Sequence, residues 1–164
     1  MDIAIRPITP DDIGAIASLA RAAWFSAYSD ILPPGQIDYM LAQRYGHGRF
    51  DADLADPQKW LHQALIDDVR AGFATCDIHE GEFRLHELYI HPDMQHRGLG
   101  AALVAHAAGL AREHGYPALI LAVNKNNAQA IRAYDKYGFR VRDEIVADIG
   151  GGFVMDDYIM EKPA

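Results

Sequence analysis

Only one cysteine, Cys76, occurs among the 164 residues of this chain. A single cysteine excludes an internal disulfide and fits a reducing cytoplasm. Long apolar runs are also missing, since none approaches the about 20 residues that a membrane helix needs. Positive charge is scarce, because 15 lysines and arginines face 23 acidic residues for a formal charge of −8. This composition argues against nucleic-acid and membrane partners and suits a cationic substrate, although solubility alone also explains the charge.

The chain also lacks several motifs that mark common kinds of site. Neither HExxH nor HxxxH occurs among the eight histidines, so we expect no metal site. Gly98 and Gly100 begin a dinucleotide fingerprint, but Leu103 stands where its third glycine is needed. Cys76 has no histidine placed to activate it, which favours a small packed residue over a nucleophile.

The length suffices for one domain with a sizeable core. No repeat, linker or low-complexity segment divides the chain, so we expect a single domain over residues 1–164. Residues 1–5 lack the basic start and the long apolar core of a secretion signal, which agrees with a cytoplasmic protein.

Apolar periodicity and turn residues predict a mixed α/β protein. Strands are expected at residues 3–6, 60–66, 69–78, 83–91, 118–123, 139–146 and 153–161. Helices are expected from residue 9 onward and at 36–45, 100–114 and 127–137, with residues 46–57 mostly in a loop. The sheet would begin as an antiparallel meander, gain a strand–helix–strand unit and end in a hairpin.

The segment QHRGLG at residues 95–100 is the most informative part of the chain. It follows an apolar strand pattern at 85–90 and leads into a helical pattern. The first N–H groups of a helix have no partner within the helix, and the helix dipole adds partial positive charge there. Gly98 and Gly100 lack a Cβ, so a phosphate can come close to the backbone. The segment therefore predicts a phosphate site, most simply for the pyrophosphate of a cofactor.

Three separated features match one known family. The first is the spacing QxxGxG at residues 95–100, and the second is NAxAxxxYxxxGF at residues 127–139. The third is the order of the elements, which covers essentially the whole chain. With these features the chain resembles the GNAT acetyltransferase superfamily. The pattern WxxxYxxILP at residues 24–33 also resembles the helices on the acceptor side of that family.

The resemblance implies a fold and an activity. The fold would be a mixed, mostly antiparallel sheet of six or seven strands, flanked by about four helices in α-β-α layers. The activity would be transfer of an acetyl group from acetyl-CoA to a primary amine of a small molecule, peptide or protein, by direct attack. A non-catalytic domain that only binds acyl-CoA is the alternative. Exposed strand edges would also allow a homodimer, and the sequence does not identify the amine.

The resemblance also implies which residues hold acetyl-CoA. Backbone N–H groups of the 95–100 segment and the following residue would hold the pyrophosphate. These residues are His96, Arg97, Gly98, Leu99, Gly100 and Ala101. The side chain of Arg97 would add charge at the outer phosphates, or it is simply solvated. The main chain of Leu88, Tyr89 and Ile90 would bond the pantetheine arm and supply a donor to the thioester oxygen. Asn127 would cap a helix and bond the cofactor, or serve as a cap alone.

Tyr134 matches the family tyrosine that protonates the thiolate of coenzyme A. A phenol suits this role because its ordinary pKa of about 10 keeps it a neutral donor at neutral pH. An aromatic residue packed on the apolar face of its helix is the alternative. Tyr137 is three residues away, but the spacing to Asn127 and Gly138 selects Tyr134.

The base that takes the proton of the amine is less clear. Some family members carry a glutamate where this chain has Ala122, so that base is missing. We expect Glu87 to replace it, because alternation along the strand places it on one face with Leu85 and Tyr89. Partial desolvation there would raise its pKa and its basicity. An ion pair with Arg84 or another cation is an equally open interpretation.

The acceptor amine is expected near the end of the first helix. Trp24, Phe25 and Tyr28 form an aromatic cluster that would surround an alkyl or ammonium group. Aromatic residues at helical spacing also form ordinary core, so both interpretations remain open.

Overall fold

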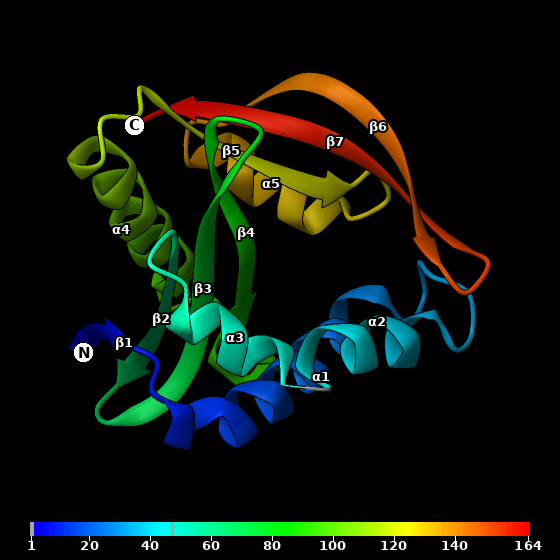
Figure 1. Cartoon of the computed structure of the whole chain (residues 1–164), viewed down its shortest axis with the longest axis horizontal. Coiled ribbons are helices and arrows are strands. Elements are labelled where there is room, and N and C mark those ends of the chain that lie inside the picture. The colour runs from blue at the N-terminus through cyan, green and yellow to red at the C-terminus, as the bar shows by residue number, and fades with distance from the viewer. Residues whose placement is uncertain (1, 47) are drawn as a thin grey trace.

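The computed structural model describes residues 2–46 and 48–164, and it contains a seven-stranded sheet with helices on both faces (Figure 1). The strands are β1 (Ile3–Pro7), β2 (Lys59–Ile66), β3 (Val69–His79), β4 (Glu82–Ile90), β5 (Ala118–Asn124), β6 (Arg140–Gly150) and β7 (Phe153–Pro163). Their order is β1-β2-β3-β4-β5-β7-β6. Neighbouring strands are antiparallel except β4 and β5, which are parallel. The expected mixed, mostly antiparallel sheet is confirmed.

Helices form a layer on each face of the sheet. They are α1 (Ile13–Tyr28), α2 (Gln36–Tyr45), α3 (Arg49–Ala55), α4 (Leu99–Glu113) and α5 (Ala128–Lys136), with short 3-10 turns at Pro10–Asp12 and Pro92–Met94. Helices α1, α2 and α3 share one core with β2 and β3, built around Trp24, Phe50 and Phe73. Helix α4 covers the other face around Leu103, and α5 packs beside it through Ile131. The expected α-β-α layers are therefore present.

Helix α3 corrects the expectation of a loop at residues 46–57, of which position 47 lies outside the described residues. The segment is short and mostly polar, so its sequence pattern alone is a poor helix signal. Phe50 is 1% exposed and packs in the core beneath α1 and α2. Tertiary burial of this side chain, rather than helix propensity, stabilises α3.

The starts of two helices agree with the sequence pattern. The side chain of Asn127 accepts a hydrogen bond from the N–H of Ala130 at 3.2 Å, as expected for a cap of α5. Helix α4 follows Gly98, which has a φ of +81°. Helix α1 begins later than expected, because a 3-10 turn comes first and the Asp12 carboxylate accepts from the N–H of Thr9 at 2.9 Å.

Strands β4 and β5 separate soon after they meet. Their pairing is confined to Phe83 with Leu119 and Arg84 with Ile120. Beyond these pairs, residues 85–90 of β4 have a free backbone edge on the side of β5. Backbone groups at such an edge are available to an extended ligand, which adds to the sheet like another strand.

A β-bulge in β4 reverses the expected facing of Glu87. Thr75 of β3 pairs with Glu87, but the next residue, Cys76, pairs with Leu85, so His86 is the extra residue. A bulge inserts one residue into the alternation, and the side chains after it change face. Leu85 packs in the core under α4, whereas Tyr89 packs against the core of α1. The expectation that Leu85, Glu87 and Tyr89 share one face is wrong.

In the described part of the chain, no helix has the length and apolar character needed to cross a membrane.

Candidate active site

A cavity of about 560 Å³ opens where β4 and β5 separate. Its walls come from the end of α1, the free edge of β4, the start of α4 and one face of α5. Most residues expected to form the site contribute to these walls. They are Tyr28, Glu87, Leu88, Tyr89, Ile90, His96, Gly98, Leu99, Gly100, Asn127 and Tyr134. Segments far apart in the sequence therefore meet around one space.

Four expected site residues lie outside the cavity lining. Arg97 is exposed on the loop, and Ala101 lies further along α4. Trp24 is 6% exposed and packs in the core, with its ring centroid 5.4 Å from that of Tyr28. Phe25 is 37% exposed, and the guanidinium of a neighbouring arginine lies 4.8 Å from its ring. The structure thus replaces the expected cluster of three aromatic residues by Tyr28, with Trp24 supporting it from behind.

The loop before α4 has the geometry of an anion site. Both His96, with a φ of +64°, and Gly98, with a φ of +81°, adopt the left-handed conformation. This costs a residue with a side chain about 1 kcal/mol, and such strain is typical of functional loops. The first intrahelical bond of α4 runs from the N–H of Ala102 to the carbonyl of Gly98 at 3.1 Å. The amides before Ala102 therefore point out of the helix with no partner in it.

The two glycines of this loop have different reasons to be glycine. A Cβ on Gly98 would meet no described atom within 4 Å, so the left-handed φ is the constraint there. A Cβ on Gly100 would lie 2.7 Å from the hydroxyl of Tyr137. Gly100 therefore allows α5 to approach α4, which the sequence pattern did not indicate.

Tyr134 lies on the face of α5 that borders the cavity. Its ring centroid is 5.6 Å from that of Phe139, and the two rings meet edge to face. Burial raises the pKa of Tyr134, so its hydroxyl stays protonated at neutral pH. The side chain therefore presents a protonated hydroxyl at the wall of the cavity.

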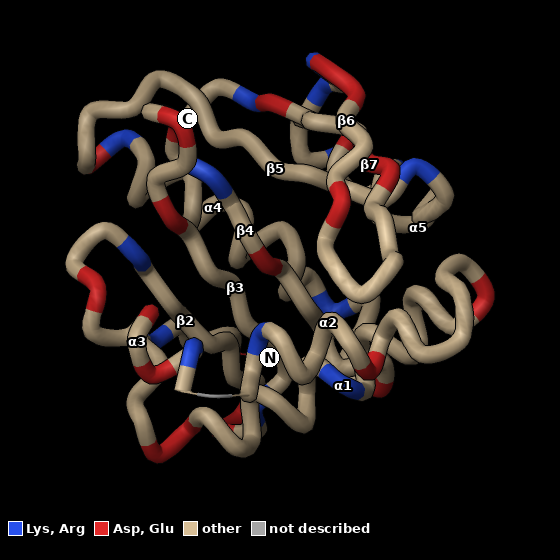
Figure 2. Tube along the Cα trace, turned by 45° about the vertical axis from the view of Figure 1, so that its right-hand side comes forward, with Lys and Arg blue, Asp and Glu red and all other residues tan. Residues whose placement is uncertain are grey.

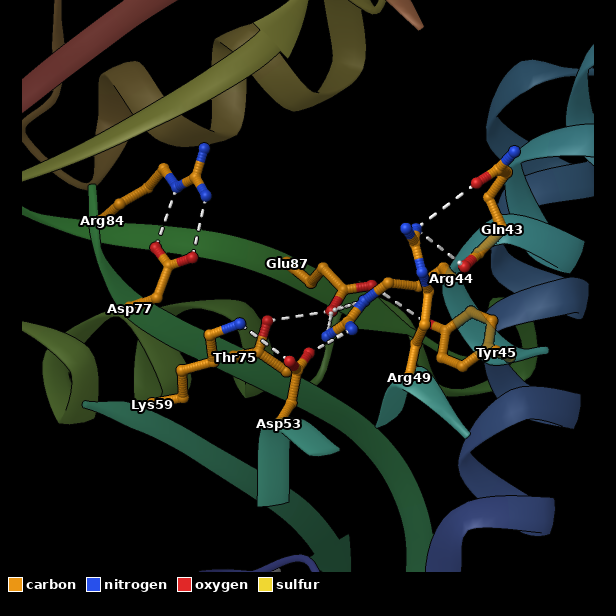
Figure 3. A network of polar contacts seen from close by, with 10 residues as sticks. All are labelled: Gln43, Arg44, Tyr45, Arg49, Asp53, Lys59, Thr75, Asp77, Arg84 and Glu87. Atoms are coloured by element: carbon orange, nitrogen blue, oxygen red, sulfur yellow. Dashed lines mark hydrogen bonds and ion pairs between the residues drawn. The ribbon is translucent and has the colours of Figure 1, made fainter. Parts of the chain in front are cut away.

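Glu87 is the centre of a buried polar network on the side of α2 (Figure 3). Its Oε1 accepts from Nε and Nη2 of Arg44 at 2.9 and 2.7 Å and from the hydroxyl of Thr75 at 2.9 Å. Its Oε2 accepts from the hydroxyl of Tyr45 at 2.9 Å. Arg44 also pairs with Asp53. The network ties β4 to β3 and to α2.

These contacts decide the protonation of Glu87. Burial by itself would raise its pKa, but the charges of Arg44 and His86 and the hydrogen bonds from Arg44 and Thr75 outweigh it. The pKa of Glu87 is lowered as a result. The expected rise in pKa and basicity is therefore wrong. The ion pair that forms instead is with Arg44, because Arg84 is bonded to another carboxylate.

Cys76 has the environment of a packed residue. It is 3% exposed, and burial raises the pKa of its thiol to about 12. A thiol with such a pKa is not ionised at neutral pH, and the thiolate is the nucleophilic form. In residues 2–46 and 48–164, no group of three or more histidine, cysteine or acidic side chains is arranged to hold a metal.

Comparison with known proteins decides the family. A model described as the acetyltransferase (GNAT) family matches residues 17–139. The chain belongs to the GNAT acetyltransferase family. It is 25% identical over 166 residues to spermidine N(1)-acetyltransferase of Thermoplasma acidophilum, with 99% of this chain and 98% of that protein aligned.

A solved structure and a second curated relative agree with this assignment. The structure matches the crystal structure of the PaiA N-acetyltransferase from Thermoplasma acidophilum in complex with coenzyme A, with a TM-score of 0.86, 25% identity and 100% of both chains covered. The ribosomal protein bS18-alanine N-acetyltransferase of Salmonella typhimurium is 37% identical over 83 residues, which are 50% of this chain and 56% of that protein. The family indicates a transferase, and the named acceptors differ between relatives.

Sequence reasoning missed the partners of Glu87 in this GNAT site. Arg44 is 43 residues away from Glu87 in the chain, and Tyr45 is 42 residues away. Both lie at the end of α2, where no spacing in the sequence relates them to β4. Only the packing of α2 over the sheet brings them to the carboxylate.

Proposed function

We propose that this GNAT protein transfers the acetyl group of acetyl-CoA to a primary amine by direct attack. The observation that carries the proposal is the single cavity that joins the start of α4, the free edge of β4 and the hydroxyl of Tyr134. Each part suits a different section of acetyl-CoA. The complex of the PaiA relative with coenzyme A supports this choice of cosubstrate.

Backbone groups would hold the cosubstrate. The outward N–H groups at the start of α4 suit the two negative phosphates. The unpaired edge of β4 at Leu88, Tyr89 and Ile90 suits the amide groups of the pantetheine arm, which hydrogen-bond as another strand does. An N–H at this edge also serves as donor to the thioester oxygen, and one such donor is typically worth about 10²–10³ in rate.

Side chains would donate the proton to the leaving group and hold β4 in position. Tyr134 donates its phenolic proton to the departing thiolate, and its raised pKa keeps that proton in place at neutral pH until the thiolate forms. Glu87 holds the bulged β4 against α2 through Arg44 and Tyr45, and so fixes the edge that receives the thioester. Direct attack fits the site better than an acetyl-cysteine, because Cys76 is buried as a neutral thiol.

An amine panel tests the proposal. The protein is mixed with acetyl-CoA and spermidine, free amino acids, a peptide with an amino-terminal alanine or simple alkylamines, and free thiol is followed. We expect thiol release that depends on at least one amine, with the acetylated amine identified by mass spectrometry. Thermal stabilisation by acetyl-CoA without thiol release from any amine would instead show that the protein only binds acyl-CoA. Two features favour that alternative: Glu87 is held in an ion pair, and Ala122 stands where some family members carry a glutamate base.

Substituting valine for Gly98 will weaken acetyl-CoA binding. The φ of +81° strains a β-branched residue by roughly 1–2 kcal/mol, and the added methyl groups project into the open space before α4. Gly115 provides the matched control, because it also has a φ of +81° and open space but lies at the other end of α4. Calorimetry should show lower affinity for Gly98→Val alone, while both variants lose similar thermal stability. Equal affinity in the two variants would contradict a phosphate site at this loop.

A further inference from the structure

Asp157 of β7 faces the same side of the sheet as α1 and α2. Two residues earlier, the sulfur of Met155 lies 3.5 Å from the side-chain amide of Gln36 in α2. Side chains two residues apart share a face of a strand, so Asp157 points toward this helical layer. The next residue, Tyr158, packs on the opposite core beneath α4. Across the ladder, Asp157 pairs with Asn124 at the end of β5.

The negative charge of Asp157 acts on Tyr28, which lines the cavity. Burial and the negative charge of Asp157 together raise the pKa of Tyr28 at the end of α1. Tyr28 lines the cavity together with Ala122 of β5, which shares the face of Asn124 because the two residues are two positions apart. Asp157 therefore lies near Tyr28, behind the part of the cavity wall that Tyr28 and Ala122 form and on the side away from the core under α4.

One oxygen of Asp157 has no partner. Its Oδ1 is buried and makes no hydrogen bond to any described residue. The nearby cation is already engaged, since Lys125 bonds Asp156 and Glu144, each at 2.8 Å. A buried carboxylate oxygen without a donor is costly, and such an exception in a protein calls for an explanation. A donor supplied by a ligand would satisfy it.

The strand that carries this oxygen and its neighbour β6 are rich in acidic residues. Acidic residues recur along β6 and β7, as Figure 2 shows by the red segments on both strands. They are Asp143, Glu144, Asp148, Asp156, Asp157 and Glu161. Negative potential around a cleft attracts cations and raises their local concentration.

We propose that Asp157 binds the ammonium group of the acceptor and accepts its proton. This assignment rests on the proposed acetyl transfer and deepens it, because it makes the acceptor a cationic amine and names its base. Spermidine, the substrate in the name of the Thermoplasma relative, belongs to this chemical class.

The protonation of Asp157 suits the task better than that of Glu87. Burial, with a contribution from the charge of Asp156, raises the pKa of Asp157 to about 6, and Lys125 opposes the rise. The titratable and charged groups that face it are Tyr28 of α1, Asp156 of β7 and Lys125 after β5. A carboxylate with this pKa is ionised at neutral pH yet is a stronger base than an ordinary one.

Two protons leave the nitrogen of the acceptor during the transfer. The carboxylate of Asp157 takes one proton from the ammonium group and passes it to solvent. The nitrogen lone pair then forms the N–C bond with the thioester carbonyl, and the C–S bond breaks with its electron pair leaving on sulfur. Tyr134 donates its proton to that sulfur and regains one as the nitrogen loses its second proton. The products are the amide, the free thiol and one released proton.

The pair Asp157→Asn and Asp156→Asn tests the assignment. Asp156 is the matched control, because it is adjacent in sequence but its side chain is 53% exposed and bonded to Lys125. We expect Asp157→Asn to lower kcat/KM for the amine about 10²-fold or more at pH 7, with the KM for acetyl-CoA unchanged. The fall in rate on the acid side of about pH 6 should disappear with the carboxylate. Near pH 10 the difference should narrow, because the free amine no longer needs a base.

Stability measurements distinguish a loss of catalytic activity in Asp157→Asn from unfolding of the variant. The pKa of Asp157 is raised above its value of 3.8 in the unfolded chain, so ionisation disfavours the fold as pH rises through about 6. Asp157→Asn should therefore be at least as stable as the parent at pH 7.5. A variant with parental pH dependence, or equal losses in Asp157→Asn and Asp156→Asn, would overturn the assignment.

The affinity for spermidine tests the role of Asp157 separately from the proposed acetyl transfer. With coenzyme A present, calorimetry with spermidine should show affinity about tenfold or more lower in Asp157→Asn than in the parent or in Asp156→Asn. If the parent releases no thiol with any amine, acetyl transfer fails while this comparison still tests the ammonium site. Equal binding in all three proteins, or no binding in the parent, would overturn the role of Asp157.

Discussion

Replacing Tyr134 with phenylalanine will lower kcat by about 10²-fold or more, with the affinity for acetyl-CoA nearly unchanged. The ring that packs edge to face on Phe139 is kept, and only the hydroxyl at the cavity wall is lost. Without that hydroxyl, the departing thiolate must leave as an anion or take a proton from water. Steady-state kinetics with a responsive amine and calorimetry with coenzyme A measure the two effects separately.

Tyr137→Phe is the matched control for this prediction. Tyr137 also lines the cavity, and its ring centroid is 6.5 Å from that of Tyr134. Its hydroxyl lies 2.7 Å from the position that a Cβ on Gly100 would take, so it packs at the start of α4. We expect this variant to keep kcat close to the parent value. If the two variants lose turnover equally, or if Tyr134→Phe keeps full turnover, Tyr134 is not the proton donor.

Arg44→Met will lower the free energy of unfolding by about 3–5 kcal/mol at pH 7. The side chains of Arg44 and Glu87 are 17% and 4% exposed, so the substitution leaves a buried carboxylate without its counter-charge. Methionine keeps an unbranched, flexible stem but lacks the guanidinium group, so both hydrogen bonds to Oε1 are removed. Denaturant unfolding followed by circular dichroism measures the change.

The stability lost in Arg44→Met should depend on pH and should be smaller at acidic pH. In the parent the pKa of Glu87 is lowered, so its ionised form stabilises the fold above the ordinary pKa of 4.5, and that contribution fades as pH falls. In Arg44→Met, the lowering by Arg44 is lost, so burial raises the pKa of Glu87 against only the effects of His86 and Thr75, and protonation relieves the unpaired charge. The difference in stability should therefore shrink from pH 7 toward pH 4.

The double variant Arg44→Met with Glu87→Gln is the control. Removing both charges leaves no uncompensated ion, so it should be more stable at pH 7 than Arg44→Met alone. A double variant no more stable than the single one would show that Arg44 acts through its other contacts, such as that with Asp53. A loss below about 1 kcal/mol in Arg44→Met would contradict a buried pair altogether.

Local features of this GNAT protein could be predicted from the sequence. The loop before α4, the Asn127 cap and the placement of Tyr134 depend on residues within a few positions of one another. Glycine conformation, helix capping and the spacing along one helix face are properties of short segments. These segments also carry most of the cavity wall on the cosubstrate side.

Features that depend on distant contacts could not be predicted in this way. Helix α3 exists because Phe50 is buried by α1 and α2, and the bulge at His86 is visible only when β3 is paired with β4. That bulge turns Glu87 toward Arg44 and so reverses the expected direction of its pKa. Asp157 is distinguished from the other acidic residues only by the folding of β7 against β5, which leaves one of its oxygens buried without a partner.

The amino-acid order alone thus determined the family, the mixed sheet and the glycine loop before α4, because strand alternation, helix periodicity and glycine turns are encoded locally. Tertiary structure alone decided that Glu87 is neutralised by an ion pair and that one oxygen of Asp157 is left without a partner. The pKa of a side chain depends on the burial and charges around it, and those neighbours come from segments that meet only when the chain has folded.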